Sequence, residues 1–303
     1  MTTVTSIKQY IYSATCILGI LTFAACDLNS GSGSEPQLNI METAQSYSEL
    51  ERFVEAVEDA ELESVLTGTG PYTVFPPTNE AFDNLPDEMR DTLSNDQMAG
   101  ILEYHIIEDE FYGSDFEERQ ALETREGGDL YFVLDDSIYV NDTTAVIAGN
   151  IQATNGLVHA VDQVLLPDRF LPVFDIIGKR YALQTFEEGI REAEMASMLQ
   201  EDHEEGYTVF VAPESVFEEQ SLPDDPQELE SQLSYHIAPG KIAADDLVDG
   251  QTIETVHGKE ISIGREGDTI TINGNAVVTE PDLAGTNGIV HIIDALLDPS
   301  AEQ

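Results

Sequence analysis

The sequence predicts an α+β protein in which one domain occurs twice, and three observations support this fold class. Residues 155–167 read N-G-L-V-H-A-V-D-Q-V-L-L-P, and residues 287–299 repeat this pattern as N-G-I-V-H-I-I-D-A-L-L-D-P. The two blocks lie 132 residues apart, which is the length of a whole domain and too long for a solenoid repeat. In each unit, apolar residues first follow the period of a helix and later alternate as in strands.

Three further blocks repeat in the same order, which indicates duplication of the whole unit. The pairs are residues 72–75 (Y-T-V-F) with 207–210, residues 104–106 (Y-H-I) with 235–237, and residues 137–141 with 269–273. The distance between partners changes by a few residues, which loops accommodate at little cost in free energy. We therefore expect two domains, at residues 39–167 and 168–299.

The first unit opens with a helical pattern. Apolar residues recur at helical spacing and predict an amphipathic segment, namely Leu50, Phe53, Val54, Val57, Leu62, Val65 and Leu66. Ser48 and Glu51 have the spacing of a capping box at its start, and residues 68–71 (G-T-G-P) end it. Thr78 is expected to cap a short helix that carries Ala81 and Phe82.

Strand patterns follow the helices. Residues 72–75 form a short aromatic and β-branched run that Pro76 and Pro77 end. The expected hairpins pair residues 130–134 with 138–140 in the first unit, and residues 261–263 with 270–272 in the second. Helices first and mostly antiparallel strands afterwards predict an α+β domain, not a doubly wound one.

The N-terminus reads as an export signal that ends at a cysteine. Lys8 is the only charge in residues 1–26, and an apolar stretch from residue 10 to 25 leads to Cys26. Small residues before Cys26 resemble a bacterial lipobox, so we expect a lipoprotein signal peptide over residues 1–26 with Cys26 as the lipid attachment site. The alternatives are a signal peptide cut elsewhere and an uncleaved signal anchor. Residues 27–38, rich in Gly and Ser, read as a flexible tether.

The repeated motifs resemble those of the fasciclin-type domain. The first unit carries Y-T-V-F-P-P-T-N-E-A-F at residues 72–82, then Tyr104-His105, then the 155–167 block. The second unit has Glu214-Ser215 in place of Thr78-Asn79. The resemblance implies two tandem domains, each a wedge or sandwich of β-strands with several short helices. It also implies a secreted or surface-anchored protein that takes part in adhesion or matrix interactions and needs no cofactor.

The Tyr-His pairs have two interpretations. The resemblance implies partner binding by Tyr104, His105, Tyr235 and His236, because this region is implicated in receptor adhesion in better-known fasciclin domains. Their position at a helix-to-strand junction also suits packing, which is the more common role of a tyrosine there.

The repeated block contains a second pair of conspicuous residues. His159 shares a strand face with apolar neighbours, as does His291, so we expect both rings to be buried and hydrogen-bonded. Asp162 and Asp294 lie on the opposite face, which argues against a His-Asp relay. All four residues are expected to support the fold.

Neither catalysis nor metal binding is expected. The sequence has no G-x-S-x-G, phosphate loop or H-E-x-x-H, and residues 203–206 (H-E-E-G) stop short of the last. Cys16 and Cys26 both precede the folded part, which excludes a disulfide or thiolate site within it. Residues 245–250 lack the ligand spacing of an EF-hand, so no calcium site is expected.

The charge is strongly acidic throughout. The chain has 59 Asp and Glu against 12 Lys and Arg, with 28 acidic residues in residues 39–167 and 29 in residues 168–303. This excess excludes nucleic-acid binding and any attraction to an anionic membrane, so membrane contact is expected through the lipid anchor only. Adaptation to high salt explains an excess of acidic residues that is spread evenly over both units. The alternative is that the acidic surface steers a cationic partner towards the protein.

Together these observations predict an envelope-anchored, non-catalytic adhesion protein. The alternative is a periplasmic lipoprotein that holds a small molecule, lipid or glycan in a cleft at the wedge or between the domains. The expected partner is a protein or glycan at the cell surface or in the periplasm. The expected location is the bacterial cell envelope, at the outer membrane, cell surface or periplasmic face.

Overall fold

The structure, a computed structural model, describes residues 38–300. The predicted signal peptide, Cys26 and the tether up to residue 37 lie outside the described residues. Within residues 38–300, no helix is both long and apolar enough to cross a membrane.

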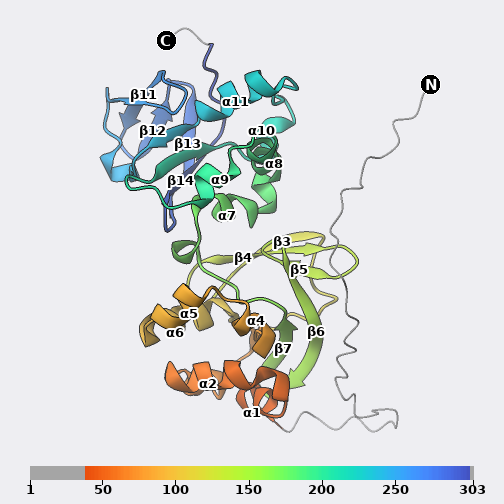
Figure 1. Cartoon of the computed structure of the whole chain (residues 1–303). Helices are drawn as coiled ribbons and strands as arrows, with labels where there is room; N and C mark the ends of the chain where they lie inside the picture. Colours follow the sequence, from red (N-terminus) through yellow and green to blue (C-terminus); the bar gives the residue numbers. More distant parts are fainter. Residues whose placement is uncertain (1–37, 301–303) are drawn as a thin grey trace, which may run out of the picture. The chain divides into compact units, whose positions relative to one another are not determined.

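Two seven-stranded sheets, one in each unit of the predicted duplication, dominate the fold (Figure 1). We call residues 39–167 repeat 1 and residues 168–299 repeat 2. The strands of repeat 1 are β1 (Tyr72–Val74), β2 (Ile106–Ile107), β3 (Arg119–Glu123), β4 (Asp129–Leu134), β5 (Ile138–Val140), β6 (Thr144–Ala153) and β7 (Gly156–Val161). Those of repeat 2 are β8 (Tyr207–Val211), β9 (Ile237–Pro239), β10 (Thr252–Glu254), β11 (Glu260–Glu266), β12 (Thr269–Ile272), β13 (Ala276–Ala284) and β14 (Gly288–Ile293).

The two sheets have the same topology. Their strand orders are β2-β1-β7-β6-β5-β4-β3 and β10-β11-β12-β13-β14-β8-β9. Strand β1 pairs with β7 in parallel, as β8 does with β14, while the other ladders between described strands are antiparallel. The predicted α+β class and the predicted hairpins, which are β4 with β5 and β11 with β12, are confirmed.

Short helices accompany each sheet. Repeat 1 contains α1 (Ile40–Gln45), η1 (Ser48–Leu50), α2 (Glu51–Asp59), α3 (Glu63–Leu66), α4 (Asn79–Asp83), α5 (Asp87–Thr92) and α6 (Asn95–Tyr104). Repeat 2 contains η2 (Asp168–Phe170), α7 (Val173–Gly178), η3 (Tyr181–Leu183), α8 (Gln184–Glu192), α9 (Ala196–Gln200), α10 (Glu214–Phe217), α11 (Pro226–Ser234) and η4 (Ala244–Asp246).

The predicted start of the first amphipathic segment is wrong. Ser48 lies in the 3₁₀ turn η1, where its hydroxyl bonds to the side chain of Glu49. The residue at the N-cap of α2 is Leu50, whose side chain forms no capping hydrogen bond. Instead Asn79 accepts the N–H of Arg52 at 2.9 Å and donates to the carbonyl of Ser48 at 2.8 Å. The capping function is therefore performed by a residue distant in the sequence. The predicted cap at Thr78, which accepts from the N–H of Ala81, is confirmed.

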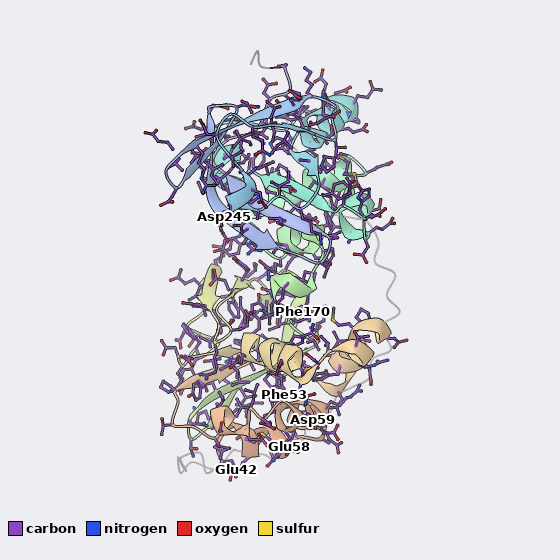
Figure 2. The ribbon with its side chains drawn as sticks, turned by 90° about the vertical axis from the view of Figure 1, so that its left-hand side faces the viewer. Glu42, Phe53, Glu58, Asp59, Phe170 and Asp245 are labelled. Atoms are coloured by element: carbon purple, nitrogen blue, oxygen red, sulfur yellow. The ribbon has the colours of Figure 1, made fainter. Side chains whose placement is uncertain are left out.

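Apolar side chains pack on both faces of the central strands. In repeat 1, Val158 faces the helices with Phe53 of α2, and Val161 on the other face packs with Phe75 and Phe132. Repeat 2 divides its core in the same way. Figure 2 shows Phe53 together with Glu58 and Asp59 of the same helix, whose side chains are exposed. Helix α2 therefore contributes apolar residues to the core and acidic residues to the surface.

Candidate functional site

The Tyr-His pair of repeat 1 ends helix α6 and is buried. Tyr104 is 1% exposed and His105 is fully buried. Nε2 of His105 accepts the N–H of Leu165 at 2.9 Å, and Nδ1 lies 2.7 Å from the carbonyl oxygen of Ile101. This pattern fits the neutral tautomer with the proton on Nδ1. The ring thus ties the end of α6 to the segment that follows β7.

Repeat 2 builds the same connection. Nδ1 of His236 lies 3.0 Å from the carbonyl oxygen of Gln232, and Nε2 accepts the N–H of Leu297 at 2.9 Å. Burial lowers the pKa of His105 and of His236 to about 4.

The tyrosine hydroxyls of both pairs are also engaged. The hydroxyl of Tyr104 donates to the carbonyl of Asp129 at 2.6 Å, and that of Tyr235 donates to the carbonyl of Glu260 at 2.9 Å. Each accepts a bond from an asparagine amide, Asn141 in repeat 1 and Asn273 in repeat 2. All four side chains of the Tyr-His pairs are buried, so they offer a partner almost no surface in this structure. Partner binding by these residues stays a prediction, and their burial restricts it to an indirect role.

The buried histidines make stability depend on pH. The folded-state pKa of His105 and His236 lies below the ordinary value of about 6.5. Between these two pKa values the unfolded chain therefore binds more protons than the folded chain. Stability should therefore fall as the pH drops from about 6.5 towards 4, by about 2 kcal/mol for each ring at pH 5. Urea unfolding at pH 7 and pH 5 in high NaCl measures this difference. Equal stability at both values would mean that the rings accept protons inside the fold.

The histidines of the repeated block are buried as well. Nε2 of His159 lies 2.9 Å from the carbonyl oxygen of Phe111, and the ring stacks on Phe75 with centroids 5.5 Å apart. Nε2 of His291 lies 2.9 Å from the carbonyl oxygen of Ile242, and its ring stacks on Phe210. Burial lowers the pKa of both rings.

The aspartates of this block bond to the neighbouring strand. Asp162 accepts the N–H of Ala145 at 2.8 Å, and Asp294 accepts the N–H of Val277 at 2.7 Å. In neither repeat does the structure bring the histidine and the aspartate together as a relay.

Sequence reasoning did not assign a role to the asparagine that opens each repeated block. Asn155 accepts the N–H of Ile40 at 2.9 Å and donates to the carbonyls of Leu66 and Gly68, both at 2.8 Å. Asn287 accepts the N–H of Val173 and donates to the carbonyls of Leu199 and Glu201. Each side chain therefore joins two helical segments to the central strand. The presence of asparagine at the same position of both repeated blocks was the sequence signal that could have pointed to this role.

A charged cluster lies where the repeats meet, and we call Asp168, Lys179, Arg180, Tyr104 and Tyr131 the junction cluster. Asp168 forms ion pairs with Lys179 and with Arg180, the latter at 2.9 Å. Lys179 also donates to the hydroxyl of Tyr104 at 3.0 Å, and the Arg180 guanidinium lies 5.1 Å from the Tyr131 ring centroid. Tyr104 thereby forms a hydrogen bond with the segment that follows α7, and Tyr131 forms a cation–π contact with it.

Burial and the neighbouring charges both shift the pKa values in this cluster. Burial acts to raise the pKa of Asp168, but the charges of Arg180 and Lys179 outweigh it and hold that pKa below its ordinary value. Burial lowers the pKa of Lys179 and raises that of Tyr131 to about 12. Asp168 pairs with both cations, and Arg180 also lies 3.9 Å from a carboxylate oxygen of Glu280. Sequence reasoning missed it, although adjacent cations at residues 179–180 are conspicuous in a chain with 12 Lys and Arg.

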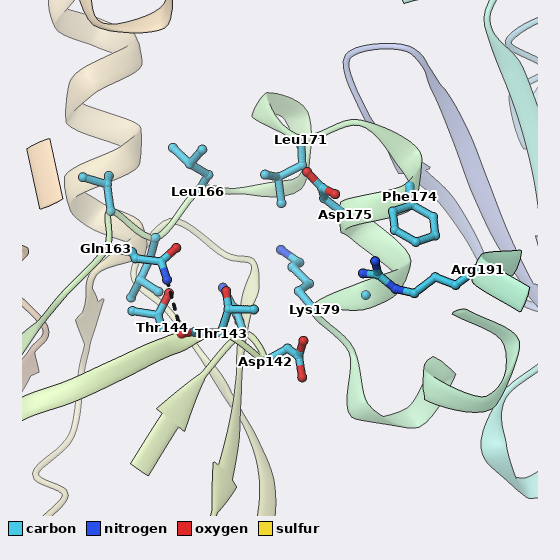
Figure 3. A pocket seen from close by; sticks show the side chains of 14 residues that line it. Asp142, Thr143, Thr144, Gln163, Leu166, Leu171, Phe174, Asp175, Lys179 and Arg191 are labelled. Atoms are coloured by element: carbon cyan, nitrogen blue, oxygen red, sulfur yellow. Dashed lines mark hydrogen bonds between the residues drawn. The ribbon is translucent and has the colours of Figure 1, made fainter. Parts of the chain in front are cut away.

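A cavity of about 230 Å³ lies beside this cluster (Figure 3). Residues 141–144 and 163–166 line it from repeat 1, while Phe174, Asp175 and Arg191 contribute from repeat 2. A second cavity, of about 370 Å³, adjoins the tyrosines of the junction cluster. Among residues 38–300, no group of three or more His, Cys, Asp or Glu side chains is placed to hold a metal ion.

Comparison with known proteins confirms the resemblance seen in the sequence. The model of the fasciclin domain family matches residues 48–167 and 182–299. Human periostin is 28% identical over 273 residues, which cover 86% of this chain and 31% of periostin. The Synechocystis protein sll1735 is 35% identical over 130 residues, which cover 42% of this chain and 97% of that protein. The chain spans about a third of the length of the first animal relatives it matches.

A solved structure shows the same fold. A domain pair from the insect cell adhesion molecule fasciclin I matches with a TM-score of 0.57 at 23% identity, covering 82% of this chain and 97% of that chain. Since the family model matches both repeats, the chain belongs to the fasciclin domain family.

Proposed function

We propose that this chain is an envelope-anchored, non-catalytic adhesion or matrix-interaction protein. The observation that carries the proposal is the tandem pair of fasciclin domains that follows a Gly-Ser segment and an N-terminal cysteine. The fasciclin I pair comes from a cell adhesion molecule, which supports the same role for this pair. The domain boundary is proposed at residues 167 and 168.

Two repeats suit adhesion because they present two weak sites on one anchor. When the first site binds, the second binds as an intramolecular event at high effective concentration. A weak site in each repeat is then sufficient. The buried Tyr-His pairs support such sites by holding the surface segments above them in place.

A deletion strain tests the adhesion role. Cells that lack the protein should adhere less to each other or to their matrix, and the wild-type chain should restore adhesion. Unchanged adhesion after deletion would refute the role.

Lipid attachment at Cys26 is part of the proposal. Replacing Cys26 with serine removes the acylated thiol, so the protein should move from the detergent phase to the soluble or unprocessed fraction. Mass spectrometry of the mature N-terminus measures this directly. An unmodified N-terminus downstream of Cys26 in the wild-type protein would contradict it.

We further propose that the acidity is an adaptation to high salt. Counter-ions screen the repulsion among the carboxylates, so the melting temperature should rise with NaCl into the molar range. A melting temperature independent of NaCl would favour capture of a cationic partner.

The second candidate function is a periplasmic ligand-binding lipoprotein. The cavity between segments of both repeats favours it. Protease treatment of intact cells separates the two candidates, because an adhesion protein at the cell surface is cleaved and a periplasmic protein is protected.

A further inference from the structure

Several contacts between the two repeats pair a cation with an aromatic ring. Lys179 donates to the hydroxyl of Tyr104 and lies 5.1 Å from the centroid of its ring, and the Arg180 guanidinium lies 5.1 Å from the centroid of Tyr131. The Tyr131 ring also meets the Tyr181 ring edge to face, with centroids 6.1 Å apart. We call these five residues the inter-repeat contact.

Two further arginines lie at the same place. The Arg119 guanidinium of β3 lies 5.8 Å from the centroid of Tyr181. Arg169 forms an ion pair with Glu126 of repeat 1, and a Cβ on Gly100 of α6 would overlap the Arg169 guanidinium. Together with the two cations of the inter-repeat contact, four of the 12 Lys and Arg in this acidic chain are therefore placed where the repeats meet.

The start of repeat 2 differs from the start of repeat 1 at these positions. Helix α1 begins at Ile40 and α7 at Val173, so the two copies correspond here at an offset of 133 residues. At this offset, the residues of repeat 1 that correspond to Lys179, Arg180 and Tyr181 are Ser46, Tyr47 and Ser48. The two cations therefore occur only in the copy whose start faces the other repeat.

The end of repeat 1 differs from the end of repeat 2 in the same sense. Tyr131 of β4 corresponds to Ser262 of β11, because the Tyr-His pairs fix the offset at 131 residues. At the same offset, Gly100 of α6 corresponds to Ser231 of α11. Glycine destabilises the interior of a helix, so the room that Gly100 leaves for Arg169 is gained at the expense of helix stability.

The inter-repeat contact is largely buried. Tyr104 is 1% exposed, and Lys179 and Arg180 are each 6% exposed. Attraction between a cation and an aromatic ring is strongest where water is excluded, and salt screens buried charges much less than exposed ones. Two domains that share a small polar interface usually move relative to each other. A buried contact made by residues that only the facing ends possess argues for the opposite here.

We propose that the inter-repeat contact holds repeats 1 and 2 as one rigid unit, so that the two repeats tumble together and present their surfaces at a fixed separation. A partner that touches both repeats then binds without the entropy loss of aligning them. This inference concerns the geometry of the chain and does not rest on the adhesion role.

Nitrogen-15 relaxation of the chain from residue 27 to 303 measures the rotational correlation time of each repeat. In the wild-type chain, both repeats should have the correlation time calculated for the whole of residues 38–300. The double variant Tyr131→Ser, Tyr181→Ser has at each position the residue of the other copy, and both rings are partly exposed, so both repeats should stay folded. In this variant both correlation times should fall by about a third, as expected for two domains on a flexible linker. Backbone amide chemical shifts check that both repeats are folded.

A second variant removes a cation in place of the rings. Lys179→Ser also introduces the residue of the other copy, and Asp168 keeps its ion pair with Arg180. This variant loses the bond to the Tyr104 hydroxyl, so both correlation times should again become shorter.

Tyr139→Ser is the matched control. Tyr139 lies on β5 of the same sheet as Tyr131, and its hydroxyl bonds to Asp136 within repeat 1. The control thus removes the same atoms from outside the inter-repeat contact, and both correlation times should stay at the wild-type value.

Three results would overturn the proposal. These are wild-type repeats that tumble faster than the whole structure, wild-type correlation times in both the double variant and Lys179→Ser, and an equal shortening in Tyr139→Ser. Each of them leaves the adhesion role intact, because the deletion strain tests that role by a separate readout.

Discussion

Replacing Gly156 with alanine should unfold repeat 1 under conditions in which the wild-type chain is stable. A Cβ at Gly156 would lie 1.9 Å from the carbonyl oxygen of Tyr72, and the residue has φ +148°. Strands β1 and β7 pair at this point, so neither backbone can move without breaking the sheet. Overpacking and backbone strain together should lower the free energy of unfolding by more than about 4 kcal/mol. Urea unfolding in high NaCl measures the loss.

Gly258→Ala is the matched control for this change. Gly258 also has a positive φ, +85°, but a Cβ there would meet nothing within 4 Å. Only the backbone preference is lost, which costs about 1 kcal/mol. If the two variants unfolded at the same urea concentration, the close approach of β1 and β7 would not matter for stability.

Replacing Asp168 with asparagine should be the second most damaging change. The substitution removes the carboxylate that Lys179 and Arg180 share, and these two cations are each only 6% exposed. Removing one partner from a buried ion pair costs about 3–5 kcal/mol because an uncompensated charge stays behind. Calorimetry should show a lower melting temperature and weaker coupling between the two repeats.

Asp245→Asn is the control for Asp168→Asn. The Asp245 side chain is fully exposed in repeat 2 (Figure 2) and lies 3.8 Å from Arg265, so its loss should not change the melting temperature measurably. Equal melting of the two variants would mean that the junction cluster does not stabilise the chain.

The duplication, the α+β class and the hairpins were predictable because each depends on local pattern. Residues 130–134 and 138–140 alternate and are joined by three polar residues, and they form β4 and β5. The cap at Thr78 is equally local, because its hydroxyl bonds three residues along the chain.

Contacts between distant residues were not predictable from local pattern. Asn79 caps α2 from 27 residues away, and Asn155 reaches Ile40 across 115 residues. Ser48 has the right spacing for a capping box, but the 3₁₀ turn η1 removes it from the position where it could act.

In the candidate site, too, the local features were predictable and the contacts between distant residues were not. The sequence identified the Tyr-His pairs, yet their bonds to Leu165 and Leu297 depend on chain segments about 60 residues away. The junction cluster requires repeat 2 to be placed against Tyr104, which no pattern within one repeat specifies. The duplication in the sequence therefore predicts the features that the two repeats share, but not the contacts between one repeat and the other.

Competition between soluble protein and intact cells decides whether the tandem repeats mediate adhesion. The chain from residue 27 to 303, added to wild-type cells, should occupy the partner and inhibit adhesion in a saturable manner, while the Gly156→Ala chain, in which repeat 1 is unfolded, should inhibit more weakly. Adhesion that is unaffected by the folded chain at every concentration would contradict the adhesion role.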